Sequence, residues 1–282
     1  MKSPLRLTLL LGMGMAFAAS SAMGAFTFTN GDLILGFQAT GGQGQFTNVF
    51  FNLGSGVYHR NNPGGNDPFG TTGQTQIGNI GVTLSLAFGN WFDRDDVFFG
   101  IYGNLNPNPN SGIGSAGAIA GDPSRTTYVS RDTATVGGSL PWSGFTSNAL
   151  GSAGNTFSGM EDMVTTLNNG ADGSAILVQA SNPTAWANGW TSNNPPAGAF
   201  GIFGGGIQQN FGELDDVTYI DLQRILSTNT GANPTGNPGT GAIETTFAIA
   251  RDGSISAIPE PSSFALAMIA GCSLVVRRRR KA

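Results

Sequence analysis

Two short acidic clusters hold the densest set of side chains that could do chemistry. One lies in the stretch WFDRDD and the other in FGELDD. Carboxylates at such close spacing can bind Ca²⁺, a hard cation that takes carboxylate and carbonyl oxygens. Neither cluster has the spacing of an EF-hand loop, and Arg94 lies inside the first, so solvated turns are the simpler interpretation. The candidate calcium ligands are Asp93, Asp95 and Asp96, and the second cluster consists of Glu213, Asp215 and Asp216.

The residue patterns of common enzymes are incomplete in this sequence. A glycosidase needs two carboxylates held across a sugar, and nothing in the sequence pairs the two acidic clusters. His59 is the only histidine, and no G-x-S-x-G motif supplies a serine nucleophile for it. One G-x-G-x-x-G match begins at Gly112, but a proline-rich stretch precedes it where a dinucleotide fold requires a strand. The sequence therefore predicts a protein that is not an enzyme.

Three tryptophans are candidates for binding carbohydrate. The flat, amphipathic indole ring suits the apolar face of a sugar, but it is equally a core residue, and core packing is the alternative use. Two of the three are four residues apart, which would align them on one helical face, although Gly189 disfavours a helix there. The candidates are Trp142, Trp186 and Trp190.

The distribution of charge limits the partners of the central region. Residues 26–258 contain six arginines, no lysine and sixteen acidic residues, so their net charge is −10, against −4 for the whole chain. An acidic, lysine-free surface repels nucleic-acid phosphates and favours solubility. Because this region has no cysteine, it must be stabilised by a hydrophobic core, for which the chain's 19 phenylalanines provide side chains. Nucleic-acid binding is therefore disfavoured.

Apolar runs and turn signals predict a mainly β domain: a single β-sandwich-like unit with one or two short helices. Residues 80–88 alternate apolar with small or polar side chains, the period of a half-buried strand, although Leu84 and Phe88 would also share a helical face. Asp252 and Gly253 mark a hairpin turn. Strands are expected at 32–37, 46–53, 80–88, 97–102, 175–180, 218–226, 245–250 and 254–258, and long loops at 103–123 and 228–241.

One segment, residues 158–170, has a clear helical pattern. Ser158 and Glu161 have the spacing of a capping box, and Gly170 stands where a C-terminal cap belongs. Asn182 and Pro183 could begin one more short helix. The apolar stripe of the first helix, which we expect to pack against the core, consists of Met160, Met163, Val164 and Leu167.

Both ends of the chain have the pattern of export signals. Lys2 and Arg6 precede an apolar stretch at 7–19 and small residues at 20–25, the order typical of a secretory signal peptide. Residues 262–276 carry no charge and as a helix would span about 22 Å, which can cross a bilayer if flanking basic side chains snorkel to the interface. A nucleic-acid-binding tail or a solvated charge run would not account for that apolar segment. The basic residues after it, which predict a cytoplasmic end, are Arg277, Arg278, Arg279, Arg280 and Lys281.

Pro259, Glu260 and Pro261 stand directly before the apolar segment. The triplet, a short apolar helix beginning Ser-Ser-Phe-Ala-Leu and the terminal arginine cluster resemble, in this order, the PEP-CTERM sorting signal of Gram-negative bacteria that make extracellular polysaccharide. The resemblance covers residues 258–282. It implies a single-pass precursor in the inner membrane, cleaved by signal peptidase at one end. It also implies that a membrane-embedded exosortase recognises the triplet, removes the helix and basic tail, and passes the protein to the cell surface or extracellular matrix.

The expected organisation is a signal peptide at 1–24, a β-rich extracellular domain at 25–258 and a sorting signal at 259–282. The leading hypothesis is a non-catalytic surface or matrix protein. The alternative is a lectin-like carbohydrate-binding module associated with exopolysaccharide, and a secreted hydrolase comes third. No cofactor is expected apart from Ca²⁺ at the first acidic cluster.

Overall fold

The computed structural model describes the middle of the chain, which is mainly β. The described residues are 31–61, 75–105, 122, 125–164, 174–178, 190, 202–203, 206–212, 216–226 and 239–258. The expected signal peptide and the expected sorting signal lie outside them, so both stay predictions. Among the residues described, no helix combines the length and the apolar character that crossing a membrane requires.

Ten strands, each antiparallel to its neighbours, form one sheet. Its order is β3-β10-β9-β8-β5-β4-β1-β2-β6, and β7 pairs with β4 off this path. The strands are β1 (Asp32–Ala39), β2 (Thr47–Ser55), β3 (Thr75–Asn79), β4 (Val97–Asn104), β5 (Thr127–Asp132), β6 (Ser174–Val178), β7 (Gln208–Asn210), β8 (Val217–Ile225), β9 (Gly241–Ala250) and β10 (Ser254–Ile258). The helices are α1 (Gly56–Asn61), α2 (Gly81–Phe88), the short 3₁₀ helix η1 (Trp91–Asp93) and α3 (Ser147–Val164).

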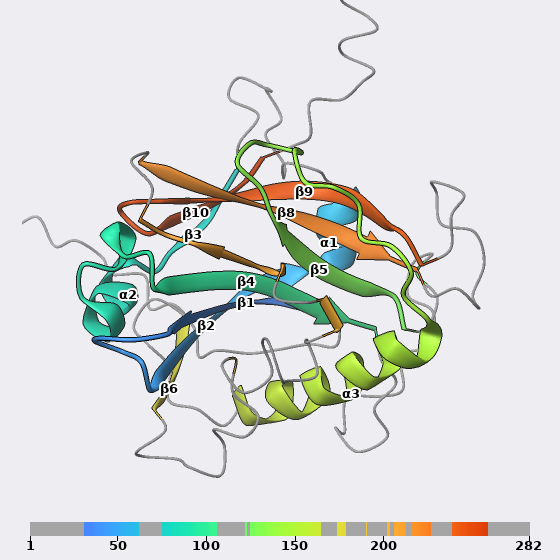
Figure 1. The fold of residues 1–282 in the computed structure, drawn as a ribbon, viewed down its shortest axis with the longest axis horizontal. Coiled ribbons are helices and arrows are strands. Elements are labelled where there is room, and N and C mark those ends of the chain that lie inside the picture. The colour runs from blue at the N-terminus through green and yellow to red at the C-terminus, as the bar shows by residue number, and fades with distance from the viewer. Residues whose placement is uncertain are drawn as a thin grey trace, which may run out of the picture.

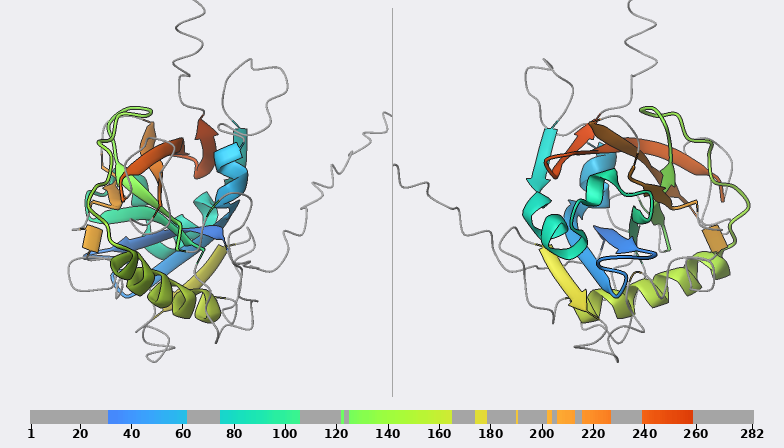
Figure 2. Two further views of the ribbon diagram at one scale, coloured as in Figure 1. Left: turned by 90° about the vertical axis from the view of Figure 1, so that its right-hand side faces the viewer. Right: turned by 60° about the vertical axis from the view of Figure 1, so that its left-hand side comes forward.

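The sheet curls until its two halves face each other. In Figure 1, β8, β9 and β10 lie above β1, β2 and β4, and Figure 2 shows the same curl from two further sides. β5 joins the halves because it pairs with β4 on one side and with β8 on the other. The mainly β character that the sequence predicts is confirmed. We expected a sandwich, but hydrogen bonds connect all ten strands into one folded-over sheet.

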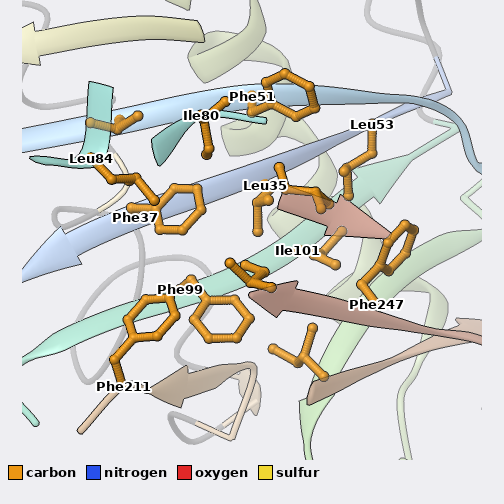
Figure 3. Close-up of a cluster of buried hydrophobic side chains, with 14 of the residues drawn as sticks. Leu35, Phe37, Phe51, Leu53, Ile80, Leu84, Phe99, Ile101, Phe211 and Phe247 are labelled. Atoms are coloured by element: carbon orange, nitrogen blue, oxygen red, sulfur yellow. The ribbon is translucent and has the colours of Figure 1, made fainter. Parts of the chain in front are cut away.

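The inner face of the curl holds the larger hydrophobic core. Leu33, Leu35 and Phe37 enter it from β1, because alternate residues of a strand point to the same face. Figure 3 shows this core, where the rings of Phe37, Phe99 and Phe211 pack together and the centroids of Phe99 and Phe211 are 4.7 Å apart. Side chains from both halves of the sheet meet here, so this core holds the curl closed.

A second core lies on the outer face, where α3 packs beneath the sheet (Figure 1). Phe157 and Met160 of α3 are fully buried in it, as is Ile34 of β1. Gly36 of β1 contacts the ring of Trp190, and a Cβ at position 36 would lie only 2.3 Å from two ring carbons. Both faces of β1 are covered, so the strand is buried from Leu33 to Ala39, and its centre from Leu33 to Phe37 has no polar side chain, as a central strand favours.

Residues 80–88 contradict the expected strand, because most of them form α2. Ile80, Leu84 and Phe88 are fully buried in the inner core, whereas Val82 and Leu86 are 71% and 74% exposed. A spacing of four fits both a strand and a helix, so the alternation in the sequence did not separate the two. Leu84 and Phe88 are one helical turn apart, so they lie on the same face of α2, and this face packs against the core.

α3 also differs from expectation, because it begins at Ser147 and not near Ser158. Thr146 caps it: the Thr146 Oγ1 accepts a hydrogen bond from the backbone N–H of Ala149 at 3.3 Å. Burial of Met160 confirms the predicted packing of that residue, whereas the side chains of Met163, Val164 and Leu167 are outside what the structure describes. The expected continuation to Gly170 and the helix expected at Asn182 lie outside the described residues.

The other expected strands are confirmed, β10 with the expected ends and β1, β2, β4, β6, β8 and β9 with shifted ends. The hairpin at Asp252 and Gly253 is also confirmed. Gly253 has a φ of +85°, which glycine adopts without strain, and its N–H donates to the carbonyl of Ala250 at 2.8 Å. The sequence patterns missed β3, β5 and β7, and β5 is the strand that joins the two halves of the sheet.

Candidate functional site

The first acidic cluster is divided between two arginines. Asp96 accepts two hydrogen bonds of 2.8 Å from the guanidinium of Arg94, and Asp93 pairs with Arg251. These hydrogen bonds lower the pKa of both carboxyls. No group of three His, Cys, Asp or Glu side chains suited to a metal ion occurs within the described part of the chain. The structure therefore does not gather Asp93, Asp95 and Asp96 into one ligand set.

Arg251 connects the two acidic clusters, which were not expected from the sequence to be paired. Its Nε donates to Asp216 at 3.1 Å, while its other end holds Asp93, so one guanidinium stands between a carboxylate of each cluster. A glycosidase acid needs a raised pKa, whereas the hydrogen bond from Arg251 lowers that of Asp93. Glu213 and Asp215 lie outside the described residues.

Arg94 has a positioning role. Its terminal nitrogens donate to the carbonyls of Gly41 and Gln43 at 2.8 Å, and to that of Phe88 at 2.7 Å. The guanidinium thus joins the turn after β1 to the end of α2, while Asp96 holds it in place. Asp96, two positions after Arg94 in WFDRDD, is therefore the ion-pair partner that orients Arg94.

The two described tryptophan candidates are core residues. Trp190 is fully buried against β1, and Trp142 is 9% exposed and packs against Phe145 and Phe203. Neither ring presents a free face, so in this structure neither can stack on a sugar. Trp186 lies outside the described residues, and its candidate role stays a prediction.

Among the described residues, the largest group of connected charged side chains lies on the inner face at one end of the sheet; we call it the Asp122 network. Asp122 is fully buried and accepts hydrogen bonds from Arg60, from Arg224 at 2.7 Å and from the Tyr128 hydroxyl. Arg224 also donates to Glu244 at 2.7 Å. The pairing of β5 with β8 brings these side chains together, because Tyr128 and Arg224 stand directly opposite each other and point to the same face of the sheet.

Charge is balanced within the Asp122 network, which contains two guanidinium and two carboxyl groups. Burial raises the pKa of the Glu244 carboxyl, against the opposing effect of Arg224. Burial also raises the pKa of the Tyr128 hydroxyl, and the hydrogen bond to Asp122 adds to this. His59, next to Arg60 on α1, is buried too, and burial lowers its pKa. With its polar groups satisfied by one another, the network fastens α1 and Asp122 to the sheet.

The outer face of β8 holds a loop formed by residues 133–142. Asp221, fully buried, accepts hydrogen bonds from the N–H of Gly137 at 3.1 Å and of Ser139 at 2.8 Å. The hydroxyl of Thr246 on β9 donates to the same carboxylate at 2.6 Å. A carboxylate that accepts two backbone N–H groups fixes the path of the loop.

Gln223, two residues further along β8, makes a second set of contacts with this loop. Its Oε1 accepts from the N–H of Trp142 at 2.8 Å, and its Nε2 donates at 2.9 Å both to the Ser139 hydroxyl and to the Leu140 carbonyl. Sequence reasoning did not identify Asp221 or Gln223. The signal available was that both residues alternate with the apolar residues Ile220 and Leu222 in one strand, and polar side chains buried in a strand are hydrogen-bonded.

Between this loop, the end of β5 and β7 lies a surface hollow of about 480 Å³, which we call the Arg131 hollow. The guanidinium of Arg131 lies over the ring of Trp142, 4.3 Å from its centroid, and donates to the Pro141 carbonyl at 3.1 Å. No carboxylate among the described residues forms an ion pair with Arg131. Its lining includes Arg131, Asp132, Thr135, Ser139, Leu140 and Gln209.

Comparison with known proteins gave no relative for this chain. No protein-family model matches it, no curated protein matches it, and no solved structure matches its fold. These comparisons do not test the PEP-CTERM resemblance, which stays a prediction from the sequence.

Proposed function

We propose that this chain is an exported, non-catalytic protein of the cell surface or extracellular matrix, sorted by an exosortase at Pro259, Glu260 and Pro261. In this proposal the chain crosses the inner membrane of a Gram-negative bacterium as a single-pass precursor. The observation that carries the proposal is the order of triplet, apolar segment and five basic residues at the C-terminal side of an acidic, lysine-free region.

The end of the folded sheet supports this proposal. β10 finishes at Ile258, directly before Pro259, and the Ile258 carbonyl accepts a hydrogen bond from the Thr245 hydroxyl at 3.0 Å. β10 is held on both sides, by β9 and by β3. Cleavage at or after the triplet would leave every described strand intact, so the released domain would keep its fold.

The arrangement of charge agrees with a protein that does not catalyse. The most buried carboxylates that the structure describes belong to the Asp122 network or hold the loop at 133–142, and both accept hydrogen bonds from the protein itself. The alternative function, a carbohydrate-binding module, loses its support from Trp142 and Trp190 because both rings are buried. That alternative would need a different site on the surface.

Replacement of Glu260 by Ala in the producing bacterium tests the sorting proposal. The two prolines keep the backbone extended, so Glu260 is the side chain offered for recognition. We expect Glu260→Ala to accumulate as full-length chain in the membrane fraction, while the unmodified protein appears in the medium in a shorter form. The readout is a blot of both fractions with an epitope inserted within residues 228–238.

Two further variants make this test specific. Glu213→Ala removes the same side chain outside the triplet and should mature normally. Replacing the five basic residues at 277–281 by Ser should instead weaken membrane retention, so that unprocessed chain escapes, because these charges hold the helix across the bilayer. Normal maturation of Glu260→Ala would show that the triplet is not the sorting signal.

A further inference from the structure

We infer that the Arg131 hollow is a binding site for a ligand that carries one carboxylate flanked by hydroxyl groups, such as a sugar acid. This inference goes beyond the sorting proposal and does not depend on it, because it uses only side chains of the folded sheet and of the loop at 133–142.

The first support is the state of Arg131 compared with other arginines of the domain. Arg60, Arg94, Arg224 and Arg251 each form an ion pair with a carboxylate, whereas Arg131 forms none among the described residues. A guanidinium has five N–H donors, and the bond to the Pro141 carbonyl uses one of them. Arg131 therefore keeps a planar set of donors of the kind that binds carboxylates in a two-pronged manner.

The second support is that the surroundings of Arg131 are fixed in advance. The ring of Trp142 supports the guanidinium from one face, and Gln223 in turn holds the Trp142 backbone. Buried Asp221 holds the opposite part of the loop. A ligand would meet donors that are already oriented, which reduces the entropy lost on binding. Two buried polar side chains, Asp221 and Gln223, hold this one surface loop, so its shape is fixed before any ligand binds.

The third support is the chemistry of the lining. The Ser139 hydroxyl accepts a hydrogen bond from Gln223, so its own proton is left to donate to a ligand. Gln209 adds an amide, and exposed Asp132 offers carboxylate oxygens that accept from hydroxyl groups. Asp132 would repel a second negative charge, which limits the ligand to one carboxylate at this place. The volume of about 480 Å³ lies in the range of small-molecule sites.

Binding of galacturonate to the full-length chain tests this inference. The protein is purified in a detergent without a sugar headgroup, and binding is followed by saturation-transfer NMR during titration. We expect galacturonate to bind and its methyl ester to bind at least about tenfold more weakly, since the ester keeps the ring and hydroxyls but loses the charge recognised by Arg131. Lactate is the third probe: affinity equal to that of galacturonate assigns the site to small hydroxy acids, and weaker affinity assigns it to sugar acids.

Two variants locate the binding. Arg131→Gln removes the charge, and we expect about a tenfold or greater loss of galacturonate affinity. Gln209→Glu deletes no contact of Arg131 but places a competing carboxylate in the lining, and it should weaken binding similarly. Arg251→Gln removes one positive charge elsewhere and should bind as the unmodified protein does. Circular dichroism of each variant checks that the fold is retained.

The inference is overturned by any of three results. Galacturonate does not bind the unmodified protein, the methyl ester binds as well as the acid, or Arg131→Gln and Gln209→Glu both bind galacturonate normally. If Arg131→Gln does not fold, Gln209→Glu alone decides the matter, because residue 209 is half-buried on a short strand.

Discussion

The Asp122 network and the Arg131 hollow lie on opposite faces of the same strands, and they differ in whether their arginines are paired with carboxylates. In the network, two arginines and two carboxyl groups are buried together and engage one another. At the hollow, one arginine lies on an aromatic ring at the surface without a carboxylate partner among the described residues. The comparison teaches that an arginine stabilises the fold where it is buried and paired with a carboxylate. An arginine at the surface without such a partner remains available to bind a ligand.

One strand supplies both regions. Arg224 of β8 points to the inner face and joins the network, while Asp221 and Gln223 point to the outer face and hold the loop at 133–142. Successive residues of a strand alternate between faces, so three polar residues within four positions need not share a task. β8 therefore couples the position of the hollow to the stability of the core.

Removal of Asp122 should cause the largest change. Asp122→Ala leaves Arg60 and Arg224 without the carboxylate that they share, and losing one partner of a buried ion pair costs about 3–5 kcal/mol. We expect the free energy of unfolding, measured by urea titration, to fall by that amount. Asp132→Ala, an exposed carboxylate at the hollow, is the matched control and should change stability by no more than about 0.5 kcal/mol. Equal effects of the two variants would break the comparison.

Removal of Asp221 should come next. Asp221→Ala leaves the N–H groups of Gly137 and Ser139 without their acceptor, and we expect a loss of about 2–3 kcal/mol. Hydrogen exchange at these two amides should accelerate more than exchange in β1, because the loop loosens before the sheet does. If both regions became equally mobile, Asp221 would belong to the core and not specifically to the hollow.

The stability of the network side should depend on pH through His59. Burial lowers its pKa, so the unfolded chain binds a proton near pH 6.5 while the folded chain does not. Stability is therefore full above about pH 6.5 and falls as the pH drops below it, by at most about 1.4 kcal/mol per pH unit. Comparing urea titrations of the unmodified protein and His59→Gln between about pH 7.5 and pH 5.5 isolates this contribution. Parallel pH curves for the two proteins would contradict it.

Removal of Arg131 should have the smallest effect on stability. Arg131→Gln loses one exposed hydrogen bond and a cation–π contact, which together contribute about 1 kcal/mol or less. Arg224→Gln, the same substitution inside the network, should cost several times more because it leaves buried carboxyl groups without their partner. A urea titration of both variants measures this contrast directly.

The sequence predicted those elements whose signals are local. Gly253 marked the hairpin between β9 and β10, and the apolar run at β4 marked a strand, because turn chemistry and apolar runs are properties of neighbouring residues. β5 and β7 were missed because polar residues such as Ser130, Arg131 and Gln209 interrupt any apolar pattern there. Those residues became strand residues through pairing with strands distant in sequence.

The candidate site was predictable only in part. Asp93, Asp96 and Trp142 were identified by residue type, but the residue type alone does not predict which side chain each of them contacts in the fold. Arg251 reaches Asp93 from far along the chain, and Arg131 lies over Trp142 because the loop returns onto β5. The Asp122 network joins α1, β5, β8 and β9, so no short stretch of sequence contains its pattern.

The sequence by itself determined the mainly β class, the charge of the central region and the pattern at residues 258–282 that suggests sorting, because composition and short motifs carry this information. Tertiary structure decided that 81–88 is a helix, that one curled sheet replaces two, and that Trp142 and Trp190 are buried. The physical reason is that burial and pairing depend on contacts between distant segments. Leu84, Trp190 and Arg131 acquired their roles only when the sheet closed around one core and α3 covered the other.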